Sequence, residues 1–418
     1  MRPNSLPRQR RTPSVIDHSG MPRKHKPDYI LLIISILLIS VGLIVIYSIG
    51  PGLSVNSNVS PNYYINRQMI SVFIGVIGFL VAAFLPLSIW LKFEKPLIII
   101  AALSALAVRL FGQEINGAYR WIQIGGLSFQ ADELIKFALL IWLAGFLAER
   151  IKNNEMANFK KTLLPLIGVL GLIGVVVAGV ESDFGTTTVI IGMMACMAII
   201  ASLPLKRIAV FGVFIVLAVI IAVAGSGYRQ QRILTYLHPS SNCQTSGYQT
   251  CQALIAVGSG GLIGLGLGNS VQAYGYLPEA ANDSIFAIFA EKFGFVGTTV
   301  LLGLFATLII RLKNIMERCP NNFSRLIVTG VLAWFTVQAF INIGAMIGVI
   351  PLKGITLPFI SYGGTSIIFV TGALGIVFHI SRYTNYTVPT KDSEREDYDS
   401  SHNRRRLRGA RNSVISSR

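Results

Sequence analysis

The sequence predicts an all-α integral membrane protein, built as a bundle of about ten transmembrane helices. Hydrophobic residues make up 52% of the 418 residues and charged residues only 13%, whereas a typical soluble domain carries about 25% charged residues. Apolar runs of about 18 residues or more recur along the chain, each long enough to cross a bilayer core of about 30 Å. Backbone amides in lipid must be paired within their own segment, so these runs are expected to be helices. Their continuous hydrophobicity disfavours a β-barrel.

Each apolar run gives one expected span. The first run follows a long polar tail, which is typical of a retained signal-anchor rather than of a cleaved signal peptide. The expected spans are 29–50, 68–88, 96–111, 131–149, 162–180, 184–203, 208–226, 284–310, 326–349 and 362–381. The longest connection, 227–283, lies between the seventh and eighth spans, and long connections are often functional. The membrane domain is therefore 29–381, between disordered tails at 1–28, which is strongly basic, and at 382–418.

Basic residues alternate between the connections and predict the orientation. They gather in every second connection, at Lys92, Lys95, Arg150, Lys152, Lys160, Lys161, Lys206, Arg207, Arg311, Lys313, Arg318, Arg325 and Arg382. The positive-inside rule places these connections and both termini in the cytoplasm. Segments 112–130, 227–283 and 350–361 are then expected to face outward, and the long loop between helices 7 and 8 is extracytoplasmic.

The formal net charge of +17 lies largely in the two tails. This placement indicates membrane topology and attraction to anionic membrane lipids, and it argues against a nucleic-acid partner. Cys243 and Cys251 share one outward loop. An oxidising compartment permits a disulfide there, but spacing alone does not establish one.

Ionisable side chains occur where a membrane protein usually excludes them. The outward loops contain Arg120, Arg229, Arg232 and Lys353, and the helix ends near them contain Arg109, Glu133, Lys136, Asp183, Asp283, Glu291 and Lys292. Such groups are costly beside lipid and are hypotheses for a functional site. Clustered outward cations suit a pyrophosphate, although lipid phosphates are the alternative for any single one. Glu133 and Lys136 share a helix face, so structural pairing and substrate contact both remain open.

Two further features allow more than one interpretation. The segment Gly258–Gly268 is rich in glycine, but it matches neither a Walker A sequence nor a GxGxxG fingerprint. Close backbone packing is the preferred interpretation, and no nucleotide is expected. Asp283 directly precedes an apolar helix, so it is either the helix N-cap or a general base at the membrane surface. These two roles are compatible, because a cap would hold the carboxylate in place.

An ordered set of motifs resembles the SEDS family of FtsW, RodA and SpoVE from about Tyr29 to Arg382. The motifs are NGAYRWIQIGGLSFQ at 116–130, DFGT at 183–186, YRQQRI at 228–233, GYQTCQALIAVGSGG at 247–261, LPEAANDSIFA at 277–287 and PLKGITLPFISYGGTS at 351–366. The LPEA and KGITLP forms are more similar to FtsW and SpoVE than to RodA.

The resemblance implies roles for individual residues. Asp283 matches the catalytic aspartate, and the family's other motif positions are matched by Arg120, Trp121, Glu133, Lys136, Asp183, Ser270 and Gln272. Arg229, Arg232 and Glu279 complete the expected substrate-binding residues. The sequence departs from the family pattern at Ala131–Asp132, Glu181–Ser182 and Ala273, where the family has Pro-Ser, Gln-Pro and often Lys. The last departure removes one cation from the expected pyrophosphate region.

The resemblance also implies an activity. It is a bacterial peptidoglycan glycosyltransferase that polymerises lipid II at the outer face of the cytoplasmic membrane, with Asp283 as general base and with Mg²⁺ or Mn²⁺. The implied partners are a class B penicillin-binding protein transpeptidase and other division proteins at the septum. A lipid II flippase or transporter and a non-catalytic divisome scaffold are the alternatives.

Overall fold

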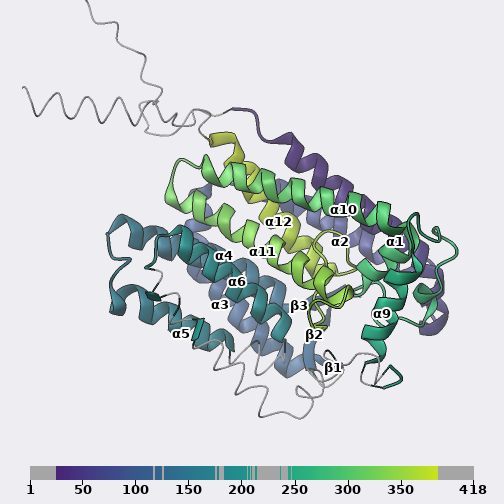
Figure 1. The fold of residues 1–418 in the computed structure, drawn as a ribbon. Coiled ribbons are helices and arrows are strands. Elements are labelled where there is room, and N and C mark those ends of the chain that lie inside the picture. Colours follow the sequence, from purple (N-terminus) through teal and green to yellow (C-terminus); the bar gives the residue numbers. More distant parts are fainter. Residues whose placement is uncertain are drawn as a thin grey trace, which may run out of the picture.

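The computed structural model describes residues 25–384, apart from 116–117, 125–126, 175–176, 178–182 and most of 205–246. The described chain is mostly helical, and its long helices run side by side as a bundle (Figure 1). The predicted helical membrane architecture is confirmed.

The helices follow the apolar runs of the sequence. They are α1 Tyr29–Ser57, α2 Tyr63–Phe84, α3 Leu87–Phe111, α4 Ala131–Lys152, α5 Leu164–Ile173, α6 Phe184–Ile200, α9 Tyr248–Ser259, α10 Ile285–Glu317, α11 Asn322–Met346 and α12 Gly364–Ile380. A π-helical turn at Phe159–Leu163 leads into α5. Within the described residues, α1, α2, α10, α11 and α12 are each long and apolar enough to cross a membrane.

Several boundaries differ from the predicted ones. Helix α3 begins at Leu87 instead of 96, because Lys92 and Glu94 have good helix propensity and extend the helix beyond its apolar part. Helix α9 lies inside the predicted long loop. The predicted span 208–226 lies almost wholly outside the described residues.

The described residues of segment 112–130 form a small sheet, an element that the sequence analysis did not predict. Strands β1 Gln113–Ile115, β2 Ala118–Ile124 and β3 Leu127–Gln130 form an antiparallel sheet in the order β1-β2-β3. Trp121 in the middle of β2 pairs with Gln130. Because α4 follows β3 without a break, the sheet fixes the position of the first turn of α4.

Helix α11 lies at the centre of the bundle. It packs against α4, α6 and α10, and its Trp334 and Gln338 are fully buried. Helix α12 packs along α2, where a Cβ added to Gly375 would lie 2.5 Å from the carbonyl oxygen of Phe79. Small residues permit such close helix contacts in membrane proteins.

The two described chain ends meet at one end of the bundle, which is the upper left of Figure 1. The backbone amide of His25 donates a hydrogen bond of 2.8 Å to the carbonyl of Arg382. The connections from α2 to α3, from α4 to α5 and from α10 to α11 lie at this same end, given the alternating directions of the helices. The sheet and the start of α10 lie at the opposite end.

The glycine-rich segment Gly258–Gly268 packs backbone against backbone on α10. Helix α10 is broken at Gly294, whose φ is 63°. The amide of Phe295 donates to the carbonyl of Gly261, and the amide of Leu265 donates to the carbonyl of Glu291, both at 2.9 Å. The segment therefore pairs peptide groups that the break would leave unbonded, and the predicted close backbone packing is confirmed.

Candidate functional site

Asp283 lies at the end of the bundle opposite the chain ends, immediately before α10. Its half-buried side chain lines a small cavity with Asn342, Lys353 and Gly354. A Cβ added to Gly354 would lie 3.5 Å from Asp283 Oδ2, so the carboxylate faces the segment that contains Lys353. An acid and a base thus lie around one cavity.

The N-cap interpretation of Asp283 is wrong. Ser284 occupies the N-cap position of α10 and makes no side-chain capping bond. Its hydroxyl instead donates to the carbonyl of Pro278 at 2.9 Å. Because Asp283 stands one residue earlier, its side chain is directed to the cavity and not to the first amides of the helix.

Among the described residues that line this cavity, Lys353 is the basic one. Its Nζ lies 3.4 Å from the hydroxyl of Thr188 on α6. Burial lowers the pKa of Lys353, and the nearby carboxylate of Asp183 opposes that change. The sequence identified Lys353 as an outward cation, but its place beside Asp283 depends on two segments that are far apart in the chain.

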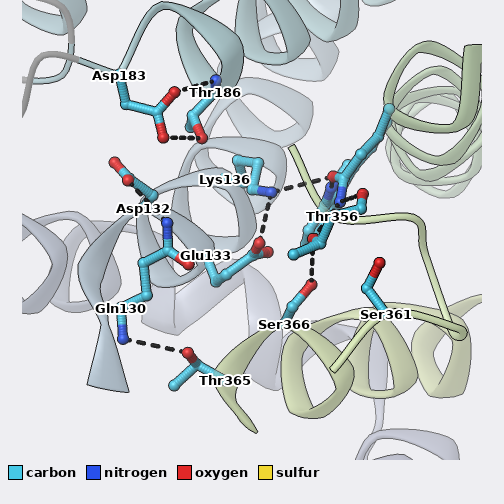
Figure 2. A network of polar contacts seen from close by, with 12 residues as sticks. Gln130, Asp132, Glu133, Lys136, Asp183, Thr186, Thr356, Ser361, Thr365 and Ser366 are labelled. Carbon is cyan, nitrogen blue, oxygen red and sulfur yellow. Dashed lines mark hydrogen bonds and ion pairs between the residues drawn. The ribbon is translucent and has the colours of Figure 1, made fainter. Parts of the chain in front are cut away.

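Asp183 is the N-cap of α6. Its carboxylate accepts hydrogen bonds from the amide of Thr186 at 2.9 Å and from the hydroxyl of Thr186 at 3.1 Å, as Figure 2 shows. A Cβ added to Gly185 would lie 2.8 Å from the carbonyl oxygen of Lys353. The capped first turn of α6 is therefore packed directly on the Lys353 segment.

Glu133 and Lys136 form a buried ion pair on α4, which is the structural pairing that the sequence left open beside substrate contact. Lys136 Nζ lies 2.9 Å from Glu133 Oε1, and only 2% and 4% of the two side chains is exposed. Lys136 also donates to Gln338 Oε1 at 3.0 Å and lies 5.1 Å from the ring centre of Trp334. The ammonium group of Lys136 is therefore in contact with Glu133, Gln338 and Trp334.

Two polar residues of α11 connect this pair to the Asp283 cavity. Gln338 Nε2 donates to the carbonyl of Thr356 at 2.9 Å. One turn later, Asn342 Nδ2 donates to the carbonyls of Asp283 and Ile355, both at 2.7 Å. Sequence reasoning missed Gln338 and Asn342. Their signal was two amides four residues apart in an otherwise apolar helix, which places them on one face.

Ser361 ties the segment before α12 to the segment before α10. Its hydroxyl donates to the carbonyl of Asn282 at 2.6 Å and accepts from the amide of Leu357 at 2.7 Å. The amide of Tyr362 donates to the carbonyl of Ala281 at 2.8 Å. These bonds hold the backbone on both sides of the cavity.

The model of the FtsW/RodA/SpoVE family of cell cycle proteins matches residues 28–386. The chain belongs to this family. It is 37% identical over 363 residues to a probable peptidoglycan glycosyltransferase FtsW of Saccharophagus degradans, covering 86% of this chain and 93% of the relative. It is 34% identical over 366 residues to stage V sporulation protein E of Bacillus subtilis, covering 87% and 99%.

Solved structures share the fold. A chain of a peptidoglycan synthase complex that coordinates polymerization and crosslinking aligns with a TM-score of 0.69 at 26% identity, over 86% of this chain and 99% of that chain. The rod shape determining protein RodA of Thermus thermophilus aligns with a TM-score of 0.62 at 27% identity, over 86% and 98%. Like these relatives, the chain is a multi-pass membrane protein.

Three residues that were expected from the sequence to bind substrate have other contacts. The carboxylate of Glu291 accepts a hydrogen bond from the hydroxyl of Ser270 and one of 3.2 Å from the amide of Gln272. Glu279 is exposed, has a positive φ of 52° and accepts a hydrogen bond from Asn282. The bonds of Ser270 and Gln272 thus lead to α10 rather than to Asp283.

The remaining motif positions are described only in part. Trp121 is half-buried in β2. The side chain of Arg120 and all of Arg229, Arg232 and Glu181–Ser182 lie outside the described residues. At the other departures from the family pattern, Ala131, Asp132 and Ala273 are buried, and Asp132 accepts a hydrogen bond of 3.2 Å from Gln130.

Cys243 and Cys251 form a disulfide with a Cα–Cα distance of 5.6 Å. Cys251 lies in the first turn of α9, so the bridge fixes residue 243 to the start of this helix. The question that the sequence left open is therefore answered by the fold.

The described residues do not form a metal site from protein ligands alone. Among them, no group of three or more His, Cys, Asp or Glu side chains lies close enough to hold a metal ion. Mg²⁺ at phosphate-transfer sites often needs only one or two carboxylates together with substrate phosphates. The arrangement around Asp283 fits only that second, substrate-dependent kind of site.

Proposed function

We propose that this chain is a peptidoglycan glycosyltransferase that polymerises lipid II, with Asp283 as general base. The observation that carries the proposal is the cavity at one end of a membrane bundle that Asp283 and Lys353 both line. The FtsW relatives named as peptidoglycan glycosyltransferases support the substrate class.

The orientation follows from the distribution of charge. Basic residues gather at the end of the bundle where the chain ends meet, including Arg150, Arg318 and Arg382. The positive-inside rule assigns that end, and both termini, to the cytoplasm. Asp283 and the sheet then lie at the outer face of the bacterial cytoplasmic membrane, where the sugars of lipid II would be exposed.

The reaction joins two lipid II molecules. The 4-hydroxyl of the acceptor GlcNAc attacks the anomeric carbon of the donor MurNAc, the new glycosidic bond forms, and the bond to undecaprenyl diphosphate breaks. Asp283 takes the hydroxyl proton as the hydroxyl attacks, and such general-base catalysis contributes about 10²–10⁴-fold. Diphosphate leaves readily once its charge is stabilised, so the scheme needs no second carboxylic acid.

Lys353 is assigned to the diphosphate side of the reaction. A half-buried ammonium group stabilises developing negative charge more strongly than one in water, because the surroundings screen it less. Arg120, Arg229 and Arg232 remain candidates for the same task from their place in the sequence. Mg²⁺ or Mn²⁺, if it accompanies the diphosphate, would supply further positive charge there.

Glu133, Lys136 and Asp183 are assigned positioning roles. Lys136 is paired with Glu133 and bonded to Gln338, which in turn holds Thr356. Asp183 holds the first turn of α6 against Lys353. These groups keep the two sides of the cavity at a fixed distance, which orients the reacting groups.

The proposed partner is a class B penicillin-binding protein, which would crosslink the strands that this chain makes. A structural relative belongs to a complex that coordinates polymerization and crosslinking. Cell division, with other division proteins at the septum, is the proposed setting because FtsW proteins recur among the relatives.

The test is polymerisation of fluorescent lipid II by the purified protein with its partner. Asp283→Asn is expected to abolish polymer while the protein elutes and melts like the wild type. Glu317→Gln removes one exposed carboxylate at the other end of the bundle and is expected to keep full activity. Polymer made by Asp283→Asn, or flipping of lipid II in proteoliposomes without any polymer, would refute the proposal.

A further inference from the structure

A hollow of about 600 Å³ lies where the two described chain ends meet, at the opposite end of the bundle from Asp283. It is lined by His25, Lys26, Pro27, Tyr29, Phe378 and Arg382. Two of these residues carry a full positive charge, and none of them is acidic. The hollow is therefore chemically suited to an anion.

Contacts between the chain ends give the hollow a fixed shape. The ring Nε2 of His25 lies 2.8 Å from the carbonyl oxygen of Thr384. The amide of Asp28 donates to the hydroxyl of Ser381 at 3.1 Å. The backbone bond from His25 to Arg382 adds to these contacts. Lys26 and Arg382 therefore lie on two chain segments that are bonded to each other, one before α1 and one after α12.

The guanidinium group of Arg382 is held by aromatic rings. Its central carbon lies 5.2 Å from the ring centre of Phe84 and 5.4 Å from that of Phe378. Cation–π contacts orient the group without neutralising it. A guanidinium held in this way can still form two parallel hydrogen bonds to a phosphate.

The carboxylate of Asp28, two residues after Lys26 in the chain, is engaged elsewhere. Asp28 caps α1 by accepting from the amides of Ile30 and Leu31 at 3.0 and 3.2 Å, and it lies 3.9 Å from Arg311. Across the described part of the chain, the ion pairs do not include Lys26 or Arg382. The positive charge of the hollow is thus not balanced by these pairs.

Exposed apolar surface begins at the edge of the hollow. Tyr29 and Ile33 of α1 are 54% and 55% exposed, and Phe84 of α2 is 69% exposed. Tyrosine is typical of the boundary between lipid head groups and acyl chains. An anion in this hollow would therefore sit at head-group depth, with room for acyl chains beside α1 and α2.

We propose that this hollow binds the phosphodiester head group of an anionic phospholipid from the leaflet at the chain-end side of the membrane. Lys26 and Arg382 contact the phosphate, and the exposed faces of α1 and α2 contact the acyl chains. A lipid is favoured over free phosphate because the cationic hollow opens directly onto lipid-facing apolar residues. Basic pockets beside transmembrane helices bind anionic head groups in this manner.

The test uses the full chain in detergent, and native mass spectrometry measures which lipids the protein retains. Phosphatidylglycerol and phosphatidylcholine compete for the protein, and soluble glycerol phosphate is added in a separate arm. The wild type is expected to retain phosphatidylglycerol preferentially. Lys26→Gln with Arg382→Gln is expected to weaken that retention about 30-fold, from the usual contribution of a basic residue near an anionic surface.

A matched control is Lys313→Gln with Arg318→Gln, which removes two charges at the same end but outside the hollow. It is expected to keep wild-type retention.

Lys26→Gln alone changes one exposed side chain, so folding is preserved, and about fivefold weaker retention is expected. Equal retention of both lipids, equal loss in the control, no loss in Lys26→Gln, or displacement by glycerol phosphate would each overturn the proposal. The readout is binding, so it is independent of polymerase activity.

Discussion

Gln338 accepts a hydrogen bond of 3.0 Å from the ammonium group of Lys136, deep between α11 and α4. The same amide oxygen accepts a bond of 2.7 Å from the indole of Trp334. Its amide nitrogen donates a hydrogen bond of 2.9 Å to the carbonyl of Thr356. One glutamine therefore connects a buried charge pair to the segment that borders the Asp283 cavity.

Lys136→Met is expected to destabilise the protein strongly, because it leaves the carboxylate of Glu133 buried without its cation. Breaking a buried pair in this way typically costs about 3–5 kcal/mol. The double variant Glu133→Gln, Lys136→Met removes both charges and is expected to recover most of that loss. Thermal unfolding in detergent measures both, and a single variant as stable as the wild type would contradict the assigned role of the pair.

Asn342→Leu is expected to reduce polymerisation at least about tenfold while the protein remains folded. The change removes two hydrogen bonds and leaves the carbonyls of Asp283 and Ile355 without this donor, and each lost bond costs about 1–3 kcal/mol. Asn322→Leu, at the exposed start of α11, is the matched control and should keep full activity. Activity assays with fluorescent lipid II compare the two. Equal activity would show that Asn342 does not position Asp283.

Local patterns in the sequence predicted the helices and offered the Glu133–Lys136 pair as one of two alternatives, since each depends on spacing within one helix. The sheet was missed because its strands are short. The only signal was in β2, where Ile122 and Ile124 alternate with the polar Gln123. The N-cap interpretation of Asp283 was wrong by one residue, which is a common error at helix ends.

Contacts between distant segments could not be predicted in the same way. Asn342 reaches Asp283 across 59 positions of the chain, and Glu291 reaches back 21 positions to Ser270. Ser270 occurs in a family motif, but only the fold shows that its hydroxyl is bonded to α10. Spacing along a single helix contains no information on such contacts.

Gly264→Ala is expected to destabilise the protein. Gly264 has a φ of 83°, and an added Cβ would lie 2.2 Å from the carbonyl oxygen of Lys292. Strained backbone of this kind costs about 1–3 kcal/mol, before the steric clash is counted. Gly258→Ala is the control, because it lies in α9 with no atom near the added Cβ and should be neutral or slightly stabilising. Thermal unfolding of the two variants should differ clearly, and equal melting points would contradict the close packing against α10.

Asp183→Asn is expected to shift the alkaline limb of the polymerisation pH profile to lower pH. Burial lowers the pKa of Lys353 and the Asp183 carboxylate raises it, so removing that negative charge lowers the pKa further. Lys353 then loses its proton at a lower pH than in the wild type, and stabilisation of the diphosphate is lost with it. Asparagine can still cap α6, so the fold and the activity at neutral pH should change less than the alkaline limb. The measurement is the initial rate of lipid II polymerisation across pH, with Asp28→Asn at the other end of the bundle as control. An unchanged alkaline limb in Asp183→Asn would show that Lys353 does not act as the cation of this site.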